Sequence, residues 1–138
     1  MDNFQTVIPM LSYENGPEAM NWLCRVFSFK ERKRWLDDNG VLMHGEVEMG
    51  NGIIMMATPS PDYQSPSTHR IKCKETAKWM EVPYVINGVL VYVDDIRKHF
   101  EHAKKEGAVI LSEIETDGPG KRYRAEDLEG QRWMFMER

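Results

Sequence analysis

The stretch Lys121-Arg-Tyr-Arg-Ala-Glu-Asp-Leu-Glu-Gly130-Gln-Arg-Trp133-Met-Phe135 decides the fold of this chain. Its aromatic residues and its alternation of side chains predict one strand over 121–126 and another over 131–137. Leu128-Glu-Gly130 predicts the turn between them, because glycine accepts backbone conformations that other residues avoid. Successive side chains of a strand point to opposite faces, so these two strands present one face to a core and leave the other available.

A strand, a helix and another strand precede this pair. Strands are predicted over 86–93 and 109–115. The residues between them favour a helix, because its apolar side chains recur at steps of three and four and both ends carry capping residues. The capping residues and the apolar stripe are Asp94-Asp95, Ile96, Phe100, Ala103 and Gly107.

The same order of elements occurs once before, about eighty residues earlier. A strand over 5–13, interrupted by Pro9, leads to a helix that begins near Pro17 and carries an apolar stripe. Strands over 29–37, 41–49 and 53–57 follow, and Asn39-Gly40 is typical of a hairpin turn. Residues 58–84 carry four prolines and are predicted as a connection, with a short helical piece around Trp79-Met80.

Composition excludes several classes of protein. The 138 residues carry a net charge of −4, which argues against general nucleic-acid binding, since that needs a basic surface. Cys24 and Cys73 provide neither a disulfide framework nor a four-ligand zinc site. No apolar run is long enough to cross a membrane, and Met1–Phe4 does not resemble the start of a secretory signal. We expect a cytoplasmic protein.

The second half resembles the vicinal oxygen chelate superfamily, which comprises the glyoxalase, bleomycin-resistance and dioxygenase group. Its closing pattern of Arg-x-Tyr, Asp-Pro-x-Gly-His and Trp-x-Phe is matched by Tyr123, by Asp127 and Gly130, and by Trp133 and Phe135, after Val93-Asp-Asp-Ile96 and the helix. The departures are Lys121, Leu128 and Gln131. His44 to Gly52 resembles its first-half strand and turn. The resemblance implies an α+β fold of two βαβββ modules whose curved sheets enclose a shared cavity. The chain would be one domain over 1–138, with modules 1–57 and 85–138 joined by 58–84.

Members of this superfamily that use a metal take its ligands from four strands. By position, the resemblance puts those four places on Ile8, Met55, Gly88 (or Asn87) and Met134. None of these side chains suits a divalent first-row metal. We therefore expect no metal and no cofactor. His99 and His102, three residues apart on the second helix, are expected on a solvated helix face rather than as ligands.

Strand alternation selects the side chains that face the cavity on the strands that carry these four positions. On the third strand the polar set faces the cavity because the apolar set should cover the first helix. On the seventh strand the resemblance implies that the position three before Asp127 faces the site. They combine an apolar lining with a few polar groups, which is typical of a small-molecule site. His44 and Glu46 are also the candidates for a general base, and Trp22, Trp35 and Trp133 are expected to be packing residues. On the third strand, Met43, Val47 and Met49 are expected against the first helix. The predicted ligand-binding residues are Met10, His44, Glu46, Met55, Leu90, Tyr92, Arg122, Arg124, Arg132 and Met134.

Three functions are compatible with these residues. The favoured hypothesis is a metal-free protein that binds and sequesters a planar or amphiphilic small molecule. The alternatives are a lyase, isomerase or dioxygenase of the same superfamily, and a non-catalytic dimer with a vestigial cavity. In each case we expect a homodimer without nucleic-acid or membrane partners, with residues 58–84 lying on the partner as one possible arrangement.

Overall fold

The computed structural model describes residues 5–138, so the quoted N-terminal residues Met1–Phe4 lie outside it. The chain divides into two compact units, which we call unit 1 (Met1–Tyr63) and unit 2 (Gln64–Arg138). Each unit contains one four-stranded sheet and a helix that follows the first strand of that sheet. The predicted α+β fold with two βαβββ modules is therefore confirmed. That the two sheets share a cavity stays a prediction.

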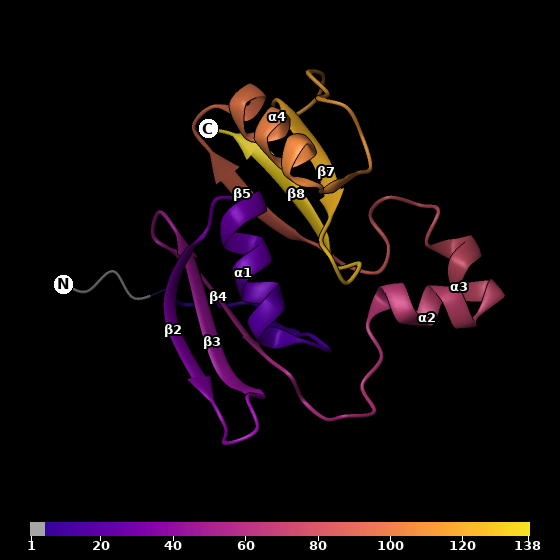
Figure 1. Cartoon of the computed structure of the whole chain (residues 1–138). Helices are drawn as coiled ribbons and strands as arrows, with labels where there is room; N and C mark the ends of the chain where they lie inside the picture. Colours follow the sequence, from indigo (N-terminus) through magenta and orange to yellow (C-terminus); the bar gives the residue numbers. More distant parts are fainter. Residues whose placement is uncertain (1–4) are drawn as a thin grey trace. The chain divides into compact units, whose positions relative to one another are not determined.

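Unit 1 is a mixed sheet with one helix on a single face (Figure 1). The strand order is β1-β4-β3-β2, in which β1 pairs parallel with β4 and the other pairs are antiparallel. The order places the first strand at the sheet edge, directly after Pro9, as a residue without a backbone N–H requires. Its elements are β1 (Met10–Ser12), α1 (Gly16–Val26), β2 (Lys30–Leu36), β3 (Leu42–Met49) and β4 (Gly52–Ala57).

Helix α1 begins and packs as its sequence indicates. The Asn15 side chain accepts a hydrogen bond from the backbone N–H of Glu18 at 3.2 Å and caps the first turn. Its buried stripe includes Met20 and Leu23, both fully buried. A side chain at Gly45 of β3 would collide with the Met20 sulfur, so the glycine lets helix and sheet approach closely. Among residues 5–63, no helix covers the other face of this sheet.

Unit 2 repeats this arrangement with two additional helices before its sheet (Figure 1). The strand order is β5-β8-β7-β6, with β5 parallel to β8. Helix α4 starts at an Asp95 cap and ends at Gly107, whose φ is 112°. The elements are α2 (Pro66–Lys72), α3 (Lys74–Trp79), β5 (Val89–Val93), α4 (Ile96–Glu106), β6 (Val109–Ile110), β7 (Arg122–Glu126) and β8 (Arg132–Glu137).

Aromatic side chains form the core between α4 and its sheet. Phe100 of α4 meets the Tyr123 ring edge-on at 5.0 Å, and Tyr123 stacks on Phe135 at 5.3 Å. Tyr123 and Phe135 are fully buried, and Trp133 is 1% exposed. These rings come from alternate positions of β7 and β8. The intervening side chains must therefore lie on the helix-free face of the sheet.

Four predicted elements differ from the observed ones, and one of them is the strand over 86–93, which begins at Val89. The strand over 5–13 is reduced to Met10–Ser12, and the strand over 109–115 to Val109–Ile110 plus a single bridge between Glu115 and Arg122. Residues 66–72 form α2, where the sequence suggested a loop rich in proline. Ser65 caps this helix and Pro66 occupies its first turn, a position that proline tolerates.

Three side chains lie elsewhere than expected. His99 is 9% exposed, not solvated, and its Nδ1 lies 2.7 Å from the Tyr123 hydroxyl. Trp35 is 64% exposed and is not a packing residue. Met43 is 59% exposed, because the register shifts between Trp35 and Leu36 and brings Leu42 into the core instead. Met49 shares the face of buried Val47, as expected, and is half-buried. No helix within residues 5–138 is long and apolar enough to cross a membrane.

Candidate functional site

The helix-free face of each sheet carries the residues that alternation nominated. Strand register determines this placement, since residues that are partners across a ladder share a face. In unit 1, Met10 is the partner of Met55, and Met55 is the partner of Glu46. Met56 and Val47, the neighbours in sequence of Met55 and Glu46, are buried on the helix side. Met10, His44, Glu46 and Met55 therefore lie on one face, although contact with a ligand stays a prediction.

A charged cluster of Arg32, His44 and Glu46 lies on this face of unit 1. The Glu46 carboxylate lies 2.7 Å from His44 Nε2 through Oε2, and it accepts a hydrogen bond from Arg32 Nε at 2.9 Å through Oε1. Glu46 is 7% exposed, whereas His44 keeps part of its ring accessible. The hydrogen bond from His44, helped by Arg32 and opposed by burial, lowers the pKa of Glu46. The carboxylate thus stays charged and orients the imidazole.

Trp35 belongs to the same face, and the sequence analysis missed it. Its register partner is His44, and the two ring centroids are 6.2 Å apart. The Lys33 ammonium lies 5.5 Å from the indole centroid, a cation–π distance. The charged run Lys30–Arg34 before Trp35 could have indicated its exposure. A strand with so many charged residues is typical of a sheet edge, where side chains remain accessible to solvent. An exposed indole beside a histidine provides a flat surface for stacking.

Two side-chain rows cross the helix-free face of unit 2. Leu90, Met134 and Arg124 are partners across β5, β8 and β7 and form the first row. Tyr92, Met136 and Arg122 form the second row in the same way. Leu90 is 47% exposed and Tyr92 48% exposed, so this face offers apolar surface beside arginines. Tyr123 and Ala125, which alternate with the arginines, are fully buried under α4. The predicted strand register of β7 is therefore confirmed.

Arg132 lies on the expected face, but its guanidinium has a structural task. Its Nη1 and Nη2 donate to the carbonyl oxygens of Val82 and Met80, each at 2.8 Å, and its Nε donates to Glu126 at 2.9 Å. Arg70 of α2 holds the same carboxylate through two hydrogen bonds at 2.8 and 3.0 Å. Arg132 is 4% exposed. The guanidinium donors of Arg132 therefore fix residues 80–82 to the sheet, and Arg132 is not among the proposed ligand contacts.

Arg122 also serves its own unit. Its guanidinium donates to the carbonyl oxygens of Asp117 and Gly120, the latter at 3.1 Å, and lies 3.3 Å from the Glu115 carboxylate. Arg124 differs: among residues 5–138 its guanidinium forms no ion pair, and it lies 5.6 Å from the centroid of the Tyr84 ring. Tyr84 is itself 64% exposed. Arg124 is thus the arginine of this face whose charge no described carboxylate offsets.

The residues that carry the sequence resemblance stabilise the turn between β7 and β8. Asp127 Oδ1 accepts hydrogen bonds from the backbone N–H groups of Glu129 and Gln131, both at 3.0 Å, and Oδ2 accepts from Trp133 Nε1 at 3.1 Å. Gly130 adopts a φ of 87° there. Asp127, Gly130 and Trp133 therefore stabilise the turn between β7 and β8. The side chains proposed to face a ligand are at other positions of these strands.

The four positions that the resemblance assigns to a metal hold Ile8, Met55, Gly88 and Met134. Their apolar side chains, and the absence of one at glycine, do not match the nitrogen and oxygen donors that a divalent metal requires. Within the part of the chain that the structure describes, no three His, Cys, Asp or Glu side chains gather as a metal site would need. The residues at these four positions therefore do not fit the metal site of the superfamily.

Comparison with known proteins agrees with this geometry. The family model described as the glyoxalase/bleomycin resistance protein/dioxygenase superfamily matches residues 8–135. TioX from Micromonospora sp. ML1 is 25% identical, with a TM-score of 0.70 over 97% of this chain and 96% of TioX. A search of curated proteins found no match.

Two more distant structures share the fold alone. TnmS3, an antibiotic-binding protein from Streptomyces sp. CB03234, is 10% identical, with a TM-score of 0.66 over 97% of this chain and 98% of its own. The bleomycin-binding protein of Streptomyces verticillus, solved with copper(II)-bleomycin, is 13% identical, with a TM-score of 0.62 over 100% of this chain and 99% of its own.

Proposed function

This chain belongs to the glyoxalase/bleomycin resistance protein/dioxygenase superfamily, and we propose that it is a metal-free protein that binds and sequesters a small molecule. The ligand would have a planar or amphiphilic body and an anionic or carbonyl group. Structures of the same fold include an antibiotic-binding and a bleomycin-binding protein, which supports binding as the role of this fold here.

The observation that carries the proposal is the state of Arg124. Two neighbouring arginines, Arg122 and Arg132, are engaged by carboxylates and backbone carbonyls of unit 2. Arg124 shares a row with Met134 and Leu90, and within the described residues it has only the Tyr84 ring beside it. A guanidinium next to apolar and aromatic surface suits a ligand that pairs an acidic or carbonyl group with an apolar body.

The experiment measures thermal shifts of the purified protein with a panel of planar aromatic carboxylates, metal-free bleomycin and copper(II)-bleomycin. Each measurement is made with and without added divalent metal. We expect stabilisation by at least one compound, independent of added metal, because a ligand that binds the folded state raises its stability by mass action. Stabilisation that requires a divalent metal would contradict the proposal.

Arg124→Ala then locates the site. An arginine contact to an anion is worth about 1.5–3 kcal/mol, so the variant should weaken binding of the identified compound roughly tenfold to a hundredfold. Arg97→Ala is the matched control, because Arg97 lies on α4 next to Phe100, away from the helix-free face. Equal loss in both variants would show that Arg124 does not contact the ligand.

A second candidate function rests on the His44–Glu46 pair. A buried carboxylate 2.7 Å from a partly exposed imidazole is the arrangement in which histidine acts as a general base with a fixed orientation. This pair would suit a metal-free lyase or isomerase that removes a proton next to a carbonyl. The test is to follow by NMR whether ligand protons exchange for deuterium in D2O. His44→Gln should abolish this exchange while the ligand still binds.

A further inference from the structure

Unit 1 contains a cavity that is separate from the residues considered above. It has a volume of about 730 Å3, within the range of small-molecule sites. It lies where the β2–β3 hairpin meets the segment that follows β4. Every lining residue belongs to unit 1: Glu14, Asp37, Asn39, Val41, Met43, Ala57, Thr58, Pro59, Ser60, Pro61 and Tyr63.

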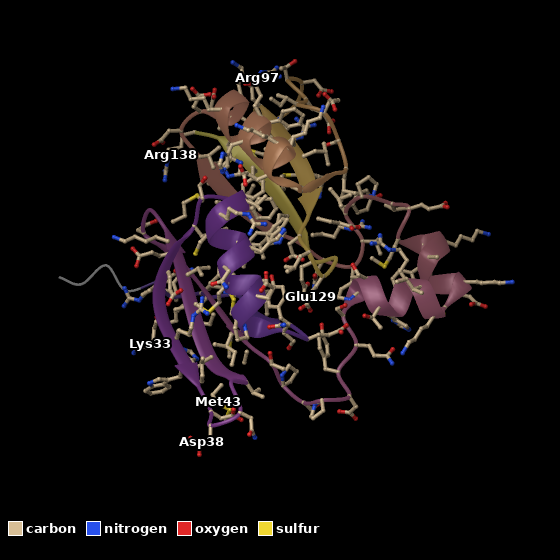
Figure 2. The ribbon with its side chains drawn as sticks, viewed as in Figure 1. Lys33, Asp38, Met43, Arg97, Glu129 and Arg138 are labelled. Carbon is tan, nitrogen blue, oxygen red and sulfur yellow. The ribbon has the colours of Figure 1, made fainter. Side chains whose placement is uncertain are left out.

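The cavity wall combines apolar surface with negative charge. Met43 is 59% exposed and Val41 36% exposed, and two prolines and Tyr63 continue the apolar wall. Met43 is accessible because the bulge in the β2–β3 ladder places Leu42, not Met43, in the core. Figure 2 shows Met43 beside the hairpin that carries Asp38.

The charged groups of the lining are all acidic. Glu14 and Asp37 contribute carboxylates, and no lysine, arginine or histidine occurs among the lining residues. Both hydrogen bonds that the hairpin backbone makes to Asp37, from the N–H groups of Asn39 and Val41, go to Oδ1 at 2.8 and 2.9 Å. These bonds fix the carboxylate at the cavity but leave its charge in place, because backbone amides are neutral donors.

We propose that this cavity binds a small molecule that carries an ammonium group on an apolar body. Carboxylates attract the ammonium group, Tyr63 provides an aromatic face that favours cations, and Met43 and Val41 contact the apolar part. The proposed ligand has the opposite charge to the one expected at Arg124. The two sites are therefore chemically distinct, and this site does not depend on the proposed function.

The experiment uses 3-phenylpropylammonium as the probe. Its neutral and anionic counterparts, 3-phenylpropan-1-ol and 3-phenylpropionate, test the contribution of charge. Titration of the 15N-labelled full chain should produce saturable shifts in the amide signals of Val41, Met43 and Thr58, and none in those of Arg124 and Met134. Shifts confined to the last two residues, or equally tight binding of the alcohol, would overturn the proposal.

Charge variants then test the carboxylate. Asp37→Asn keeps the acceptor oxygen of the turn and removes the charge, so calorimetry should show binding about fivefold weaker, the effect of one partly exposed ion pair. Asp38→Asn makes the same change in the same hairpin at a residue that does not line the cavity, and should stay within about twofold of the wild type. Equal effects of the two substitutions would overturn the assignment.

Met43→Gln provides an independent variant, because its side chain is 59% exposed and its replacement should not disturb folding. We expect weaker binding of the probe through loss of apolar contact, with the preference for ammonium over alcohol retained. Unchanged affinity in this variant would show that the probe binds elsewhere.

Discussion

The Glu126 carboxylate is 3% exposed and is held between the guanidinium groups of Arg70 and Arg132. Its charge is what permits Arg132, itself 4% exposed, to be buried there. Glu126→Gln keeps the shape and removes the charge, leaving a buried guanidinium uncompensated. We expect a loss of about 3 kcal/mol in the free energy of unfolding at pH 7, measured with urea.

Glu115→Gln is the control, because Glu115 pairs with Arg122 at 3.3 Å but its side chain is 45% exposed. Exposed ion pairs contribute about 0–1 kcal/mol, so this variant should stay close to the wild type. If both substitutions lower the free energy of unfolding equally, the buried Glu126 contacts do not stabilise unit 2 more than an exposed ion pair does.

The contribution of Glu126 should also depend on pH. Burial raises the pKa of Glu126, but the hydrogen bonds and charges of Arg70 and Arg132 outweigh burial, and the net pKa lies below its ordinary value of 4.5. A group whose pKa is lowered by folding stabilises fully above the unfolded pKa, and this stabilisation is lost as pH falls through the folded pKa. The difference in stability between wild type and Glu126→Gln should therefore be constant from pH 7 to about 5.5 and shrink below about 4.5. A difference that grows on acidification would contradict this assignment.

At the scale of elements, the turn between β7 and β8 receives the first turn of α2. The backbone N–H of Ser67 donates to the Glu129 carbonyl at 3.0 Å, and a Cβ at Gly130 would lie 2.6 Å from the Ser67 hydroxyl oxygen and 2.8 Å from its backbone nitrogen. Gly130→Ala should therefore displace α2 and impose strain at a φ of 87°. We expect a lower melting temperature and a loss of more than about 2 kcal/mol.

Gly107→Ala is the control that distinguishes backbone strain from a steric clash with α2. Gly107 also has a positive φ, 112°, but a Cβ there would meet nothing within 4 Å. It should cost only the strain of a left-handed residue, about 1–2 kcal/mol. Similar melting temperatures for the two variants would indicate that the contact between α2 and the turn is weak.

Local patterns predicted the elements that carry their own start and stop signals. Asp95 and Gly107 bound α4 as expected, and Asn39-Gly40 connects two strands. Helix α2 was missed because it has no buried residue and so no apolar periodicity, although Ser65-Pro66 is a recognisable start. Met43 was misplaced because it is the additional residue of a bulge in the β2–β3 ladder, which no local pattern marks. Trp35 was misplaced because its apolar character was given more weight than the charged run before it.

The candidate site was predictable in its faces but not in its pairings. Alternation placed Arg122, Arg124 and Met134 together on one face of unit 2, because side-chain direction depends only on position along a strand. The ion pair between Arg70 and Glu126 joins residues 56 positions apart. No local sequence pattern contains such a contact. Only the structure shows that Arg132 is engaged by Glu126 and backbone carbonyls, whereas Arg124 forms no ion pair with the described residues.

At the scale of the whole molecule, the metal content follows from the donors. Ile8, Met55, Gly88 and Met134 occupy the positions that the superfamily uses for ligands, and thioether and aliphatic groups bind divalent ions poorly. We predict that the dialysed protein holds no stoichiometric Zn, Ni, Fe or Mn. Elemental analysis showing about one equivalent per chain would contradict this. Met134→Glu should weaken binding of an apolar ligand and begin to restore metal affinity.

The edge strands of the two sheets differ in how well they could pair with another copy of the chain. In unit 2, β5 ends its sheet and pairs with β8 on one side only, and it exposes Leu90 and Tyr92 at 47% and 48%. The edge strand β2 of unit 1 is instead dense in charge, which disfavours pairing between edges. Within this chain, Arg70 and Arg132 hold residues of the segment 66–84 to the sheet of unit 2. That residues 58–84 lie on a partner stays a prediction.

We therefore predict a homodimer of about twice 16.1 kDa that forms through the β5 edge. Light scattering coupled to size exclusion should report this mass at micromolar concentration. Tyr92→Asp should shift the protein toward monomer, because it places a charge on the edge that pairs. Val109, which is 52% exposed, lies on β6 at the opposite edge of the sheet. Val109→Asp puts the same charge there and should leave the dimer intact. A wild-type monomer, or equal dissociation in both variants, would exclude the β5 edge as the interface.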